Sequence, residues 1–371
     1  MKRVRELYGF ELYKIMHSKL TIAVVLILSA LSIIMGLQFS KGASALTIYD
    51  EVRTFTGQVI DDELVSKMNA DLVNIDGLEK EENKKYFSLA HIIWMAQEGY
   101  DLISADQYYR NRLKMQEENI EDLRMAEEEI QWWKDKEEGI QKPFAYVPTL
   151  NAKTLVEYMT NITIMAILMT AICLSGVFAG EYRRNMDQIM FSCRHGRRET
   201  FIAKILAGVT FSVSFVALFV ILLTLAVWFR TGLDGLSGMV QLEIPYTAFP
   251  LTFLQFFGIQ ILIVIVASVM LAAMSMSLSA VFKNGVAVMG IMVGAYLLCQ
   301  FINVPLKFRF ISQTMNLIPT NLITMWSLGD MRLVKIFGNY HTMYSVAPFA
   351  YIICAVLFVF LGSAAFKKSQ H

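Results

Sequence analysis

Residues 205–229 read ILAGVTFSVSFVALFVILLTLAVWF, a run without a single Asp, Glu, Lys or Arg. A helix needs about 20 apolar residues to cross a hydrocarbon core roughly 30 Å thick. In lipid every backbone N–H and C=O must find a partner within the protein, and a helix provides those partners within one segment. The run therefore predicts a membrane-spanning helix.

Charge is absent from five further long runs. They cover residues 20–40, 158–180, 244–282, 284–306 and 336–366. Hydrophobic residues make up 55% of the chain and charged residues only 18%, whereas soluble proteins carry about 25% charged residues. We therefore expect an all-α membrane protein with six transmembrane helices, the last beginning near Ser345.

The first uncharged run is predicted to stay in the mature protein. It is 21 residues long, longer than the 7–15 apolar residues typical of a cleaved signal peptide, and no small-residue cleavage site stands out after it. We assign residues 19–40 to transmembrane helix 1 and residues 151–371 to helices 2–6.

The charges are distributed unevenly along the chain. Residues 41–150 hold 23 of the 32 Asp and Glu residues and 13 of the 33 Lys and Arg residues, a local net charge of −10. The N-terminus, the loop after the second span, the next short loop and the C-terminal tail instead carry an excess of Lys and Arg. Short basic segments stay on the cytoplasmic side. Both termini are therefore expected in the cytoplasm and residues 41–150 outside.

The outer insertion, residues 41–150, is predicted to be a mainly helical extracellular domain. Residues 106–141 contain no Pro and are rich in strong helix formers. Leucine, isoleucine and tryptophan residues form a heptad-like seam at Leu113, Ile120, Leu123, Ile130 and Trp133. This seam suits pairing with another helix of the domain or with a second copy of the chain. None of the four cysteines lies in this insertion, so packing alone must stabilise it.

Two further segments carry membrane-related patterns. Residues 1–18 predict an amphipathic interfacial helix, with cations beside an apolar face formed by Val4, Leu7, Tyr8, Leu12, Ile15 and Met16. The alternative is a basic tail that only sets topology. Residues 303–344 are unusually apolar for an outer loop and contain Pro319, which favours a re-entrant helical hairpin before helix 6.

Enzyme chemistry is not indicated by any motif. The sequence contains no phosphate-binding Gly-x-x-x-x-Gly-Lys-Ser/Thr loop and no His-Glu-x-x-His, and His91 has no second ligand near it in sequence. We expect no catalytic residue, metal or cofactor in this chain. Ion-coupled carriers need ionisable groups within their spans, but Lys153 and Glu157 lie only near the outer end of the second span. Energy for uphill transport would have to come from a partner.

The loop after the second span carries a recognisable pattern. Residues 176–186 read GVFAGEYRRNM, residues 190–198 read MFSCRHGRR and residues 201–206 read FIAKIL. This pattern resembles the permeases of bacterial type-2 ABC exporters, whose second span commonly ends in Glu and a basic residue, followed by Ala-Lys at the start of the third. The tight loop SAVFKNGV at residues 279–286 resembles their second cytoplasmic turn. The resemblance covers residues 1–40 and 150–371, and the long insertion departs from compact members.

The resemblance implies a permease subunit of an ATP-driven exporter in the bacterial plasma membrane. Two ABC ATPase subunits would bind ATP and Mg, and the second permease would be another copy or a homologue. Membrane lipids, but no nucleic acid, would be further partners. A combined interpretation is that the acidic insertion captures or gates an exported or resisted antimicrobial peptide, because its net charge of −10 favours cationic ligands. The alternative is that this charge serves only solubility. A membrane sensor or immunity protein, whose acidic domain binds a ligand without transport, is the alternative.

The resemblance also implies which residues couple the chain to the ATPase. A coupling helix is implied in the cytoplasmic loop of residues 181–203, and Glu181 is expected to pair with Arg183 or Lys204. The alternative is that Glu181 only marks the membrane edge. The coupling residues would be Glu181, Tyr182, Arg183, Arg184, Met186, Arg194, Arg197, Arg198 and Lys204, with Phe282, Lys283 and Asn284 in the second loop and Arg3, Arg5, Leu7 and Lys14 in the interfacial helix.

Overall fold

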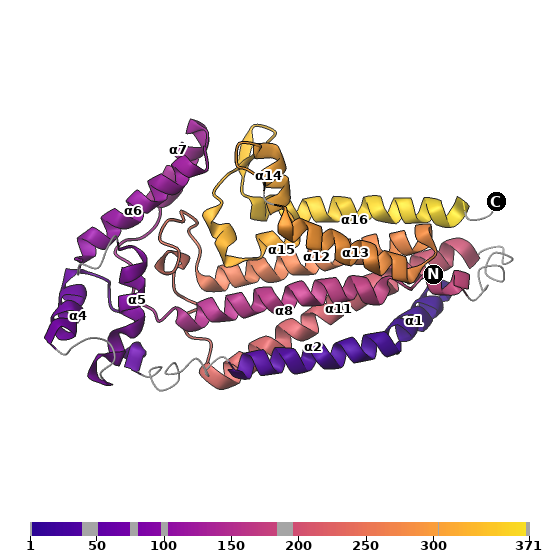
Figure 1. Ribbon diagram of the computed structural model, residues 1–371, viewed down its shortest axis with the longest axis horizontal. Coiled ribbons are helices and arrows are strands. Elements are labelled where there is room, and N and C mark those ends of the chain that lie inside the picture. The colour runs from indigo at the N-terminus through magenta and orange to yellow at the C-terminus, as the bar shows by residue number, and fades with distance from the viewer. Residues whose placement is uncertain are drawn as a thin grey trace.

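A computed structural model describes residues 2–38, 51–74, 81–97, 103–183, 196–302 and 304–368. Long helices lie side by side in an elongated bundle, with a group of shorter helices at one end (Figure 1). Helix α1 (Lys2–Met16) and the last turn of α16 (Met343–Lys368) both lie at the opposite end. We call these the domain end and the α1 end of the bundle.

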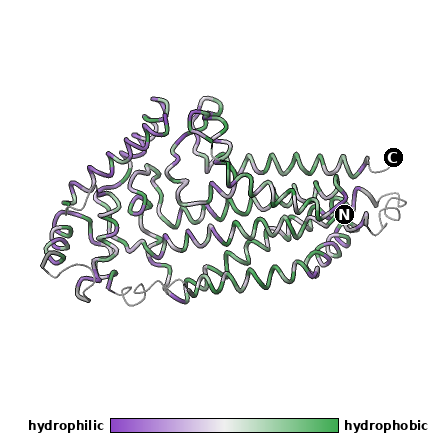
Figure 2. Tube along the Cα trace, viewed as in Figure 1, coloured by the Kyte–Doolittle hydropathy of each residue, from purple (hydrophilic) through white to green (hydrophobic). Residues whose placement is uncertain are grey.

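Five of the described helices are long and apolar enough to cross a membrane. They are α2 (Lys19–Gln38), α8 (Leu150–Leu174), α11 (Gly196–Thr231), α12 (Phe253–Phe282) and α16. Hydrophobic residues follow these helices along the bundle, whereas hydrophilic residues concentrate in the group of shorter helices (Figure 2). The chain is thus a mainly helical, multi-pass membrane protein.

The remaining predicted span, residues 284–306, corresponds to the shorter helix α13 (Gly285–Phe301). Its 17 residues would extend over about 25 Å at 1.5 Å per residue, less than a hydrocarbon core of roughly 30 Å. The Asn284 side chain begins this helix by accepting hydrogen bonds from the N–H groups of Val286 and Ala287, at 3.1 and 3.3 Å. A sixth crossing remains a prediction.

The shorter helices between α2 and α8 form a polar domain, which we define as the described residues from 51 to 149. Its helices are η1 (Arg53–Phe55), α4 (Asp62–Asn74), η2 (Glu81–Tyr86), α5 (Phe87–Met95), α6 (Ala105–Asp122) and α7 (Glu127–Glu138). A core of its own contains Tyr86, Tyr108 and Tyr146. The expected heptad seam is interrupted between α6 and α7, where Arg124 has a φ of +50°.

The segment that precedes α16 combines short helices with strands. They are α14 (Arg309–Asn316), α15 (Pro319–Leu322), η4 (Met325–Gly329), β1 (Val334–Ile336) and β2 (Asn339–His341). The segment adds one short β-hairpin to the mainly helical fold, in which β1 pairs antiparallel with β2. Phe337 and Gly338 between them have φ values of +49° and +86°, and positive φ at both central residues is what a type I′ hairpin turn requires.

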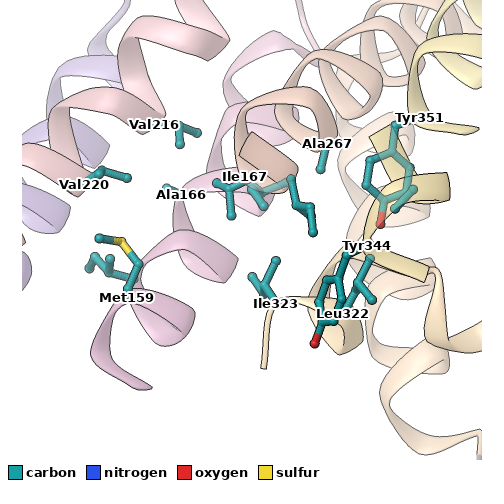
Figure 3. Close-up of a cluster of buried hydrophobic side chains, with 14 of the residues drawn as sticks. Met159, Ala166, Ile167, Val216, Val220, Ala267, Leu322, Ile323, Tyr344 and Tyr351 are labelled. Carbon is teal, nitrogen blue, oxygen red and sulfur yellow. The ribbon is translucent and has the colours of Figure 1, made fainter. Parts of the chain in front are cut away.

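Part of this segment enters the bundle. Leu322 and Ile323 are buried, and Figure 3 shows them between the helix that carries Ile167 and the helix that carries Tyr344. The Ile323 carbonyl accepts hydrogen bonds from Gln260 Nε2 at 2.6 Å and from Thr160 Oγ1 at 3.0 Å. Protein therefore covers this irregular backbone, while its depth relative to a membrane remains a prediction.

Buried carboxylates attach the polar domain to the bundle. Glu129 of α7 pairs with Arg309 and accepts a hydrogen bond from the N–H of Leu333 at 2.8 Å. Beside it, Trp133 Nε1 donates to the Met331 carbonyl at 2.6 Å. These contacts hold α7 against the segment that leads into α16.

Glu243 forms a second attachment, in the loop between α11 and α12. Its buried carboxylate accepts hydrogen bonds from Thr149 Oγ1 at 2.6 Å, Lys153 Nζ at 3.0 Å and His91 Nε2 at 3.1 Å. Burial would raise the pKa of Glu243, but the hydrogen bond from His91 and the charge of Lys153 outweigh it and hold the pKa below its usual range. One carboxylate thus joins the polar domain, α8 and the α11–α12 loop.

Small residues allow α2 to pack closely on α11. A Cβ atom built on Gly36 would lie 2.4 Å from Ala226 Cβ and 3.3 Å from the Leu223 carbonyl oxygen. Such close approach through small residues is typical of helix packing within membranes. The position therefore leaves no room for a side chain.

We predict that Gly36→Ala destabilises the protein, because overpacking costs about 1–3 kcal/mol. Gly258→Ala is the matched control, since a Cβ there meets nothing within 4 Å, and Ala is favoured over Gly in a helix by about 1 kcal/mol. The thermal unfolding midpoint in detergent should fall for Gly36→Ala and stay or rise for Gly258→Ala. Equal midpoints would contradict the close packing.

A second prediction concerns acid. The folded pKa of Glu243 lies below its unfolded value, which is about 4.3. Its contribution to stability is therefore present above that pH and is lost as pH falls through the folded pKa. The higher thermal midpoint of wild type over Glu243→Gln should shrink between pH 7 and pH 3.5. Glu118→Gln, on the exposed surface of α6, is the control, and a constant difference for Glu243→Gln would refute this account.

Candidate functional site

Helix α1 packs along the beginning of α11, at the α1 end of the bundle. Ile15 is buried in the main core, and Tyr8 Oη donates a hydrogen bond to Thr210 Oγ1 at 3.1 Å. The amphipathic helix is thus present and lies against protein. Met16 was expected on the apolar face, yet 53% of it is exposed, because α1 ends there and the chain turns into α2.

Four alternating charges meet where α1, α9 (Ala179–Arg183) and α11 converge. Lys204 Nζ lies 2.6 Å from Glu181 Oε1 and 2.8 Å from Glu11 Oε2. Lys14 Nζ closes the ring, at 2.9 Å from Glu11 Oε2 and 3.1 Å from Glu181 Oε1. We call Glu11, Lys14, Glu181 and Lys204 the ion cluster.

Burial makes the balance of these charges important. The Lys204 side chain has no exposed surface, and those of Glu11 and Glu181 expose 5% and 12%. Burial lowers the pKa of Lys14, but the carboxylates of Glu11 and Glu181 outweigh it and raise that pKa above its ordinary value. Two carboxylates and two ammonium groups cancel, so the cluster holds no uncompensated charge while all four side chains are present.

Neighbouring contacts position Glu181. After α8 ends, the N–H groups of Phe178 and Ala179 donate to Ser279 Oγ of α12, at 3.3 and 3.0 Å. The Phe178 ring packs against Phe201 of α11 and Phe366 of α16, with centroid distances of 5.5 and 5.4 Å. These contacts orient α9, so that its carboxylate faces Lys204.

The short loop between α12 and α13 lies beside this junction. Lys283 adopts a left-handed conformation with φ +54°, and its Nζ lies 4.8 Å from the centroid of the Tyr182 ring. A Cβ on Gly285 would lie 3.2 Å from Gly176 Cα. The two loops that the sequence assigns to the cytoplasm therefore meet at α9.

The structure brings together some of the predicted site residues. Glu181, Lys204 and Lys14 share the ion cluster, and Tyr182 contacts Lys283, next to the N-cap residue Asn284. Leu7 is half-buried, whereas Phe282, Arg5 and Arg198 are exposed. The backbones of Arg3, Arg183 and Arg197 lie in α1, α9 and α11, while Arg184, Met186 and Arg194 lie outside the described residues.

Sequence reasoning missed Glu11 as a cluster member. Its position was the available signal, because Glu11 lies between Tyr8 and Leu12 on the apolar face of α1. An acid on such a face needs a partner when it is buried. The attachment through Glu243 was also missed, since the residues that it contacts lie 90 or more positions away in sequence.

The geometry suits mechanical connection. Among the described residues, no group of three or more His, Cys, Asp or Glu side chains is arranged to hold a metal. The ion cluster instead links α9 and α11 to α1, which is distant from them in sequence. A displacement of α9 would have to carry Lys204, and with it α1 and α11, or break buried ion pairs.

Comparison with known proteins identifies one match. A family model described as ABC-2 family transporter protein matches residues 6–368. No curated protein and no solved structure matches the chain. The match covers nearly the whole length of the chain, including the polar domain and all four residues of the ion cluster.

We predict that Lys204→Met strongly destabilises the fold. The variant leaves Glu11 and Glu181 buried with only Lys14 to balance them, and removing one partner of a buried ion pair costs about 3–5 kcal/mol. Arg198→Gln, on the exposed surface of the same helix, should change stability by less than about 0.5 kcal/mol. Thermal unfolding in detergent checks this prediction. Similar midpoints for the two variants would show that the cluster is not a stabilising unit.

Proposed function

The chain belongs to the ABC-2 family of transporter proteins, and from this premise we propose that it is an exporter permease driven by separate ATPase subunits. Membership supports its role as the membrane component of an ABC transporter. We further propose that transport is outward and that two ATPase subunits and a second permease complete the transporter.

The observation that carries the proposal is the ion cluster. An ATPase that changes shape during its cycle needs a contact on the permease that moves as one piece with the membrane helices. Glu181 in α9 is paired with Lys204 in the first turns of α11 at 2.6 Å. The loop of residues 184–195 begins directly after α9. A partner bound to that loop would act on α11 through buried ion pairs.

The distribution of charge supports an external energy source. The sequence has no phosphate-binding loop, so we propose that ATP and Mg bind to the partner subunits and that this chain is not itself an enzyme. Among the described residues, the buried charges named above lie near the ends of the long helices, in the ion cluster and around Glu243. An ion-coupled carrier would need such groups along its pathway.

The basic segments support an orientation of the chain in the membrane. The α1 end of the bundle carries the Lys- and Arg-rich segments, which remain inside by the positive-inside rule. We therefore propose that the ion cluster faces the cytoplasm and that the polar domain lies outside a bacterial plasma membrane. Both α1 and the end of α16 lie at the same end of the bundle, as an even number of crossings requires.

The acidic insertion supports a class of substrate. Residues 41–150 carry a net charge of −10, which attracts cationic molecules by electrostatic steering. We propose cationic antimicrobial peptides as substrates, transported by a pair of permease subunits made of two copies or two homologues.

We predict that the tagged full chain, purified from native membranes in mild detergent, retains an ATPase subunit with a phosphate-binding loop. Glu181→Ala should lower the ATP hydrolysis recovered with the chain about tenfold, equivalent to about 1.4 kcal/mol on a rate, because α9 loses its ion pairs with Lys204 and Lys14 and no longer moves with α11. Lys114→Gln, exposed on α6 of the polar domain, is the matched control and should retain full activity.

Recovery of the chain without any ATPase, together with binding of a cationic peptide to the full chain, would instead support a sensor. Equal ATP hydrolysis by Glu181→Ala and wild type would remove the coupling role from the ion cluster while leaving family membership intact.

A further inference from the structure

A cavity of about 500 Å³ opens where the polar domain meets the helix ends at the domain end of the bundle. Arg53 of the polar domain lines one part of it, and the loop between α11 and α12 contributes Asp234 and Ser237. Leu233, Leu236 and Leu254 supply apolar surface. The cavity is therefore amphiphilic.

One ion pair lies in the lining of this cavity. Arg53 Nη2 pairs with Asp234 Oδ2, and the two side chains remain 42% and 46% exposed. A ligand can therefore reach both charges at once. Gly235, with a φ of +87°, keeps the loop against the Pro148 carbonyl, where a Cβ would lie only 2.4 Å from the oxygen. The charged residue next to it is thus held in a tight turn.

The cavity lies at the level where the long helices end. The apolar span of α11 ends at Arg230, and the span of α12 begins at Phe253. Asp234 therefore lies just after the α11 span, and Leu254 lies at the start of the α12 span. Pro148 lies two residues before α8. Trp228 and Phe229 on the last turns of α11 are 55% and 80% exposed, as expected for aromatic residues at a membrane boundary.

We propose that this cavity binds a zwitterionic phosphate–ammonium head group. The Arg53 guanidinium would hold the phosphate, since its planar N–H donors match phosphate oxygens. Asp234 would hold the ammonium, and acyl chains would follow the apolar surface beside Leu254. A purely anionic head group would take up the Arg53 guanidinium and leave the Asp234 carboxylate without a cation. Phosphatidylethanolamine should therefore bind in preference to phosphatidylglycerol.

The test is native mass spectrometry of the full chain, released from micelles that contain equal amounts of phosphatidylethanolamine and phosphatidylglycerol. Wild type should retain phosphatidylethanolamine preferentially. Arg53→Gln with Asp234→Asn should lower that retention about tenfold, because two charge-assisted contacts are lost. Ser237→Trp, at an exposed position in the cavity wall, should lower it by steric block with both charges intact.

The matched control is Lys114→Gln with Glu118→Gln. These residues form an exposed ion pair on α6 with side chains 54% and 58% exposed, and removing it likewise leaves the net charge unchanged. Retention in this variant should equal that of wild type, and thermal midpoints of all variants verify that they fold.

Soluble phosphoethanolamine distinguishes the two sources of the head group. If millimolar phosphoethanolamine displaces the lipid, the cavity recognises the head group alone. If it does not, the acyl chains are required and the ligand is a bilayer lipid. Equal retention of the two lipids by wild type, or unchanged retention in the Arg53 and Asp234 variant, would overturn the proposal. The result does not depend on the ATPase, because the experiment uses this chain without ATP.

Discussion

Lys204 and Glu11 lie buried at the α1 end of the bundle, and the surrounding helices can pack there only if their charges are compensated. Removing an ion from water costs several kcal/mol, and this cost is offset only by close partners with good geometry. Lys14 and Glu181 complete that compensation. The requirement fixes α1 relative to α9 and α11, although α1 is far from both of them in sequence.

The same physical constraint operates at the domain end. Glu243 is buried among Thr149, Lys153 and His91, and Glu129 is buried between Arg309 and backbone N–H groups. Between the two ends, α11 runs without interruption for 36 residues, about 54 Å at the usual rise. It joins the ion cluster to the loop that carries Asp234 and Glu243. A change at the α1 end of the bundle therefore has a continuous element along which to reach the polar domain.

Sequence patterns predict the parts of this fold that depend on local composition. Uncharged runs identify the long helices, and the periodicity of residues 1–18 predicts α1. Lys204 was one of the two partners expected for Glu181, because Glu181 and Lys204 flank the same loop. Glu11 and Glu243 were not predicted as site residues, since their partners come from distant segments and only the packed fold brings them together. The β1–β2 hairpin was missed because its turn is formed by Phe337 and Gly338, and Phe rarely adopts positive φ.

The central claim is that the four residues of the ion cluster stabilise the fold as one neutral unit. The most direct measurement compares the unfolding free energy of Lys204→Met with that of a variant in which all four charges are replaced, Glu11→Gln, Lys14→Met, Glu181→Gln and Lys204→Met. The fourfold variant should be the more stable of the two, because it leaves no buried charge without compensation. If the fourfold variant is instead destabilised by the sum of its four single substitutions, the side chains act independently and the claim is contradicted.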